Sequence, residues 1–103
     1  MSDDRAALEQ LFQASVRGRS HTLLHYLYFP TKKAAKEVAV ILRGQGFRTE
    51  ERLGADGENW LVLARHEVVP SEETIAAARQ MMEELTDSRG AEYDGWEAEV
   101  QKE

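Results

Sequence analysis

Residues His21 to Pro30 read HTLLHYLYFP, the longest apolar and aromatic run in the chain. Leucine, tyrosine and phenylalanine suit a buried strand, and a proline lacks the N–H group that a strand interior requires. The run therefore predicts a strand that ends at Pro30. Because successive strand side chains point to opposite faces, one face carries a histidine among apolar residues and the other is aromatic: Leu23, His25, Leu27 and Phe29 on the first, and Leu24, Tyr26 and Tyr28 on the second.

The segments that follow alternate between helical and strand patterns. Thr31 can cap a helix, two glycines end it, and Asp56-Gly57 is the strongest hairpin signal in the chain. A second helix opens at Ser71 and closes at Gly90, and a final strand is expected to bulge at Gly95. The predicted order is strand, helix, strand, strand, helix, strand, with the first helix over 32–45 and the other strands over 47–53, 60–66 and 91–100.

This order predicts an α+β fold of the ferredoxin-like βαββαβ kind, with four antiparallel strands and both helices on one face of the sheet. The two helices carry opposite charges, +3 on the first and −4 on the second, which favours their lying side by side. Ser2 to Val16 predicts an extra amphipathic N-terminal helix. We expect residues 1–20 to form this helix and a linker, and residues 21–103 to form the domain.

Composition excludes several classes of site. The 103 residues include no cysteine, so disulfides and thiolate chemistry are absent. The N-terminus does not resemble a signal peptide and no run approaches the ~18 apolar residues of a membrane span, so we expect a cytoplasmic protein. The net charge of −6 argues against direct binding to nucleic acid. Residues 67–103 have a net charge of −8, typical of a solvated acidic helix or of a surface facing a basic partner.

His25 is the one histidine that we single out, and we expect it to be structural, with catalysis or metal binding as the alternatives. On a buried face it needs a hydrogen-bond partner, and Tyr93 and Asp94 on the last strand are candidates. His21 and His25 would stand ~13 Å apart on one strand, which argues against a zinc site. No pattern indicates catalytic residues, a metal or a cofactor. Lys32 and Lys33 begin a helix against its dipole, where they either hold an anion or remain solvated.

The tetrapeptide Tyr93-Asp94-Gly95-Trp96, preceded by a helix that ends at Gly90, resembles the C-terminal signature of the RraB family, regulators of ribonuclease E activity. The His25 to Pro30 strand, the alanine-containing helix after it and Gly46-Phe47 resemble that family in order and spacing, over about residues 21–100. The resemblance implies a ferredoxin-like fold without catalytic activity. It also implies a protein inhibitor that binds the non-catalytic scaffold region of an endoribonuclease.

We therefore expect a non-enzymatic protein that regulates an RNA-processing enzyme of the ribonuclease E type, or its degradosome assembly, through protein–protein contact. The candidate partner surfaces are the tyrosine face of the first strand, with Tyr26 and Tyr28, and the acidic second helix together with the last strand, with Glu83 and Glu84 on the helix. One alternative is a small enzyme or ligand-binding domain built on His25, Tyr93 and Asp94. Another is a homodimer formed through the tyrosine face.

Overall fold

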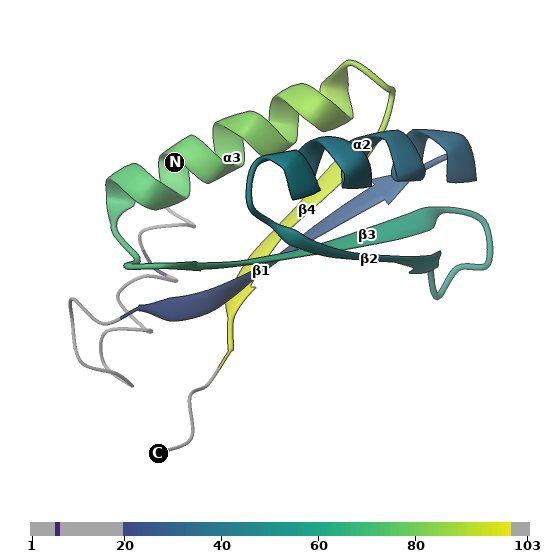
Figure 1. Ribbon diagram of the computed structural model, residues 1–103. Coiled ribbons are helices and arrows are strands. Elements are labelled where there is room, and N and C mark those ends of the chain that lie inside the picture. Colours follow the sequence, from purple (N-terminus) through teal and green to yellow (C-terminus); the bar gives the residue numbers. More distant parts are fainter. Residues whose placement is uncertain (1–5, 7–19, 100–103) are drawn as a thin grey trace.

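The fold was analysed in a computed structural model, which describes residue 6 and residues 20–99. The described helices lie above a single sheet (Figure 1). Along the chain the elements are β1 (His21–Phe29), α2 (Lys32–Gly44), β2 (Arg48–Leu53), β3 (Trp60–Val68), α3 (Glu72–Asp87) and β4 (Glu92–Ala98). Apart from residue 6, the helix expected over Ser2 to Val16 lies outside the described residues.

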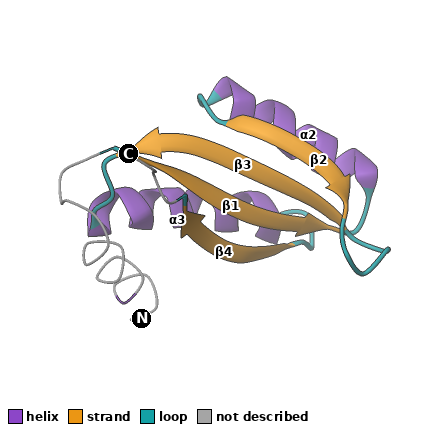
Figure 2. Cartoon of the chain, turned by 90° about the horizontal axis from the view of Figure 1, so that it is seen from below, coloured by secondary structure: helices purple, strands orange, loops and turns teal. Residues whose placement is uncertain are grey.

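The four strands form one sheet in the order β2-β3-β1-β4, and each neighbouring pair is antiparallel. Both helices lie on the same face of this sheet (Figures 1 and 2). The predicted α+β class, the order of elements and the interior position of the first strand are confirmed. None of the described helices is long and apolar enough to cross a membrane.

Local sequence explains where the helices begin. The Thr31 side chain accepts a hydrogen bond from the Ala34 backbone N–H at 3.1 Å, which satisfies one of the free donors at the start of α2. Ser71 and Thr74 form a reciprocal capping box at the start of α3, in which each side chain bonds the backbone N–H of the other residue. The predicted cap at Thr31 is thus confirmed, and Ser71 combines with a threonine instead of the more usual glutamate or glutamine.

The helix-facing side chains of β1 divide the core into two parts. Leu27 and Phe29 belong to the larger cluster, which is completed by residues from both helices and from β3. Leu23 belongs to a smaller cluster with Ile75 of α3. His25 stands between Leu23 and Leu27 on the same face and is completely buried. A polar residue therefore occupies the position between the two apolar clusters.

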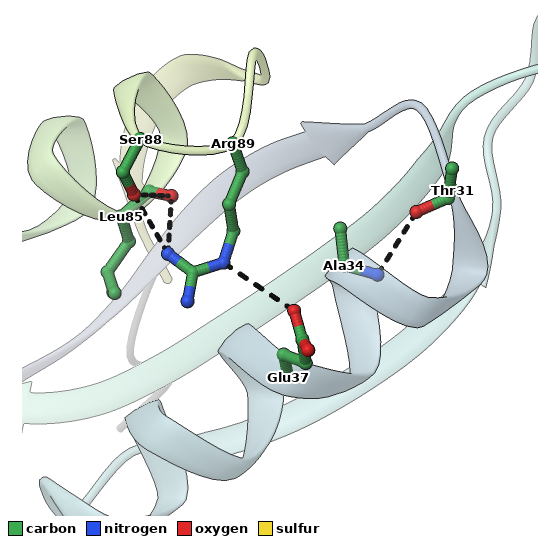
Figure 3. A network of polar contacts seen from close by, with 6 residues as sticks. All are labelled: Thr31, Ala34, Glu37, Leu85, Ser88 and Arg89. Carbon is green, nitrogen blue, oxygen red and sulfur yellow. Dashed lines mark hydrogen bonds and ion pairs between the residues drawn. The ribbon is translucent and has the colours of Figure 1, made fainter.

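An ion pair joins the two helical segments, but its positive and negative groups are exchanged relative to the predicted pairing. Just beyond α3, the Arg89 guanidinium lies 3.9 Å from the Glu37 carboxylate of α2 (Figure 3). The same guanidinium donates hydrogen bonds to the Leu85 carbonyl at 3.2 Å and the Ser88 hydroxyl at 2.9 Å. Here the acidic group belongs to the basic helix and the cation follows the acidic one, so the net charges of the helices did not predict the contact.

Candidate functional site

A line of three polar side chains crosses the buried face of the sheet. His25 of β1 lies between Tyr93 of β4 and His66 of β3. Its Nδ1 atom is 2.8 Å from the Tyr93 hydroxyl, and its Nε2 atom is 2.9 Å from the Nε2 atom of His66. In the sheet β1 lies between β3 and β4. The three side chains therefore connect all three strands.

The bond between the two imidazoles fixes how protons are shared. One Nε2 atom must carry a hydrogen and the other must accept it. If His25 donates to His66, the neutral His25 ring accepts from the Tyr93 hydroxyl at Nδ1; in the other neutral arrangement both bonds reverse. If both rings were imidazolium, two N–H groups would face each other. The cluster therefore requires at least one of the two histidines to be neutral.

Aromatic and cationic groups enclose this line of residues. The Phe47 ring stacks on His66 with 4.5 Å between centroids and meets the edge of His25 at 6.1 Å. At the opposite end, the Arg79 guanidinium carbon of α3 lies 5.7 Å from the centroid of the Tyr93 ring. His66 is half-buried, and this burial lowers its pKa below the usual value of 6.5. A neutral His66 satisfies the hydrogen bond to His25.

A bulge in β4 sets the direction of its aromatic side chains. The register against β1 shifts between His25 and Leu27, and Gly95 has a φ angle of +101°. This conformation suits glycine because it has no Cβ atom. Tyr93 pairs with Leu27, and Trp96 pairs with His25, so the bulge brings both aromatic residues to the helix-facing side of the sheet. The predicted bulge at Gly95 is confirmed.

The structure confirms the expected hydrogen bond from His25 to Tyr93. Asp94, the other expected partner, is exposed on the bulge. The contact with His66 was missed, although its signal was present. His66 shares its strand face with Trp60, Val62 and Ala64 by the two-residue period, and the hairpin places that face beside His25. Finding it required the register of the hairpin, which the turn sequence alone did not give.

The tyrosine face predicted for β1 lies on the side of the sheet opposite to the helices. Tyr26 and Tyr28 are half-buried there. The Tyr26 hydroxyl donates to Glu97 at 2.6 Å, and this hydrogen bond, together with burial, raises the pKa of Tyr26. Tyr26 is thus fixed to β4 by its hydroxyl. We keep the name tyrosine face for this side of the sheet, which includes Tyr26, Tyr28 and Glu97. Three leucines on the same side are buried: Leu24, Leu61 and Leu63.

The second predicted surface belongs to the helical layer. Glu83 and Glu84 are both exposed on α3. Glu83 lies 3.7 Å from Arg79, and Glu84 accepts a hydrogen bond from Gln80 at 3.3 Å. Since α3 covers the face opposite to the tyrosines, the two predicted surfaces do not form one continuous patch (Figure 1).

The lysines at the start of α2 have different surroundings. The Lys32 ammonium group lies 5.3 Å from the centroid of the Trp60 ring, a cation–π contact. This contact offsets part of the cost of a cation at the positive end of a helix. Lys33 is exposed. Sequence reasoning missed the contact because Lys32 and Trp60 are distant in the chain.

A hollow of about 340 Å³ lies where β2 begins. We call it the arginine notch; it is lined by Gly46, Arg48, Arg65, His66 and Glu67. His66 connects the notch to buried His25 by the bond between their Nε2 atoms. Among residues 6 and 20–99, no three histidine or acidic side chains are placed to hold a metal ion. His66 is the member of the histidine pair that an external group can approach.

The comparisons with known proteins add the family. A search among curated proteins finds no match. A family described as RraB, regulator of ribonuclease activity B, matches residues 2–98. The match includes Tyr93 to Trp96, the residues that carried the resemblance, and also residues 2–20 ahead of the sheet. Because the match spans nearly the whole chain, this protein belongs to the RraB family.

Proposed function

We propose that this protein is a non-enzymatic regulator that binds an RNA-processing enzyme of the ribonuclease E type, alone or in its degradosome assembly. The observation that carries the proposal is the match of residues 2–98 to a family of regulators of ribonuclease activity. Regulation by such a protein requires contact with the enzyme or with its RNA. The net charge of −6 favours the enzyme, because binding RNA requires neutralising phosphates.

The placement of the most reactive side chains also favours a binding role. His25 is completely buried and links β1 to both of its neighbouring strands, through Tyr93 of β4 and His66 of β3. A group so enclosed stabilises the fold and does not touch an external substrate. The exposed carboxylates of α3, by contrast, can face a partner directly, and Glu83 and Glu84 remain our candidates for a contact with basic side chains.

The test uses the full chain and the purified ribonuclease E-type enzyme of the same organism. We expect saturable binding by isothermal titration calorimetry and slower cleavage of a fluorescent RNA substrate. Fluorescence anisotropy of that RNA with the regulator alone is the control, and it should not change. Absence of enzyme binding would refute the proposal, and so would slower cleavage accompanied by sequestration of the RNA.

A further inference from the structure

The arginine notch lies at a corner of the sheet where β3 extends beyond its pairing with β2. Pairing between β2 and β3 runs from Arg48 opposite Arg65 to Leu53 opposite Trp60. β3 continues through His66, Glu67 and Val68, which pair with β1 but have no residue of β2 opposite them. The backbone on that side of β3 is therefore an open edge within the described part of the chain. Open edges of this kind accept an extended segment of another chain.

Two arginines stand side by side at this corner. Arg48 and Arg65 are directly opposite each other in an antiparallel pair, so their side chains leave the same face of the sheet. Like charges in this position destabilise a sheet. Among the described residues, neither guanidinium takes part in an ion pair. An anion between them would convert this repulsion into two attractive contacts.

The chemistry of the notch narrows the choice of anion. A guanidinium group presents parallel N–H donors that match both oxygens of a carboxylate. Glu67 also lines the notch and repels a run of phosphates, so a single acidic group fits better than a nucleic-acid backbone. Gly46 has no side chain to fill the space, and its φ angle of +97° disfavours other residues there.

We infer that the arginine notch binds an acidic side chain presented by an extended segment of a protein partner. Arg48 and Arg65 hold the carboxylate, and the open edge of β3 bonds the backbone of the segment. The inference rests on the proposed function only for its statement that the partner is a protein. Arg48 and Arg65 point to the same side of the sheet as Tyr26 and Tyr28, because Arg65 pairs with Leu24. The notch is separate from the exposed carboxylates of α3, which lie on the helical side.

His66 provides a reporter inside the notch. His66 lines the hollow and its ring is bonded to His25, so a carboxylate held in the notch would change the surroundings of this residue. Nuclear magnetic resonance (NMR) detects this change in the His66 ring signals and in the backbone signal of Gly46. Neither signal requires the ribonuclease, which allows the notch to be tested separately from the proposed function.

The experiment titrates isotope-labelled full-length protein with a blocked peptide of valine and glutamine that carries a single central glutamate. We expect saturable shifts at Gly46 and His66. Arg48→Gln and Arg65→Gln should each weaken peptide binding about tenfold, because a charged hydrogen-bonded contact is lost. Arg52→Gln is the matched control. Arg52 lies on the same strand and the same face, is 3.9 Å from Glu50, and should leave binding unchanged.

Two further arms define the ligand. A valine and glutamine peptide of the same length should bind at least several-fold more weakly, and a single-stranded RNA should give no saturable shift at His66. Removing one of two facing cations relieves repulsion, so urea unfolding should show that Arg48→Gln folds at least as stably as the original protein.

Several outcomes would overturn the inference. These are absence of saturable shifts, equal weakening by Arg52→Gln, equal binding of the uncharged peptide, or RNA binding without peptide binding. If the ribonuclease E-type enzyme binds Arg48→Gln and Arg65→Gln as well as the unmodified protein, the notch is not the partner site and the inference fails, while the proposed function stands. Peptide binding without enzyme binding would have the reverse meaning: the proposed function fails and the notch remains a site for acidic segments.

Discussion

The hydroxyl group of Tyr93 is bonded to one nitrogen of a completely buried imidazole. We predict that Tyr93→Phe lowers the free energy of unfolding by about 1–3 kcal/mol, because it leaves a buried polar atom of His25 without this partner. The ring, and with it the contact to Arg79, is kept. Tyr28→Phe is the matched control, since Tyr28 is half-buried on the tyrosine face, and it should cost less than about 0.5 kcal/mol. Urea unfolding measures both, and equal losses would contradict the role given to Tyr93.

The depressed pKa of His66 predicts how stability depends on pH. Burial favours the neutral ring in the folded state, so the unfolded chain binds a proton more readily. Stability from this residue is therefore complete above the unfolded value of 6.5 and is lost as pH falls through the lower folded pKa. The ring is bonded to His25 of β1, and the charged residues that line the notch with His66 are Arg48, Arg65 and Glu67.

His66→Gln isolates this contribution, because glutamine does not titrate. Between about pH 7.5 and about pH 5.5, the original protein should lose more unfolding free energy than the variant. Carboxylates that titrate in the same range affect both proteins and cancel in the comparison. Chemical denaturation at the two pH values measures the difference. An equal loss in both proteins would show that His66 does not couple folding to pH.

Among the secondary-structure elements, β4 depends most on a single backbone conformation. Gly95 has a φ angle of +101°, although a Cβ atom placed there would meet nothing within 4 Å. Gly95→Ala should therefore lower the unfolding free energy by about 1–3 kcal/mol through backbone strain and not through a clash. A relaxed bulge would also turn Tyr93 or Trp96 away from the helix-facing side of the sheet.

Gly44→Ala provides the comparison for that variant. Gly44 is the last residue of α2, and a Cβ atom there also meets nothing within 4 Å. Since its φ angle is not positive, alanine should be neutral or should stabilise the helix by up to about 1 kcal/mol. Thermal or urea unfolding should show a loss of stability for Gly95→Ala and no loss for Gly44→Ala. A stable, unchanged Gly95→Ala would show that the bulge does not need glycine.

The sequence predicts elements well where their ends are set by local chemistry. Pro30, Ser71 and Gly90 mark boundaries that the structure reproduces within a few residues, because caps and turns depend on neighbouring residues. Contacts between strands could not be predicted from local sequence in this way. The bond from His25 to His66 depends on the register of a hairpin, and register is fixed by turn geometry and packing over the whole pair.

Surface chemistry was predictable in composition but not in arrangement. The charges of the two helices were correct, yet the Arg89 to Glu37 contact runs against them because Arg89 follows α3 and reaches back over α2. The arginine notch was not foreseen for the same reason as the histidine pair. Arg48 and Arg65 become neighbours only when β2 and β3 pair in the observed register.

At the scale of the whole molecule, the two partner surfaces proposed from sequence lie on opposite faces, which makes them separable by mutation. If α3 contacts a basic partner, Glu83→Lys and Glu84→Lys should each weaken binding to the ribonuclease about tenfold at low salt. The weakening should be smaller at high salt, because salt screens surface charges. Glu58→Lys, an equal change of charge in the exposed β2–β3 turn, controls for net charge. Tyr26→Lys tests the tyrosine face. Calorimetry at low and high salt distinguishes the two surfaces. Loss of binding only with Tyr26→Lys would place the interface on the tyrosine face, and equal weakening by Glu58→Lys would show that the effect of the α3 variants comes from net charge alone.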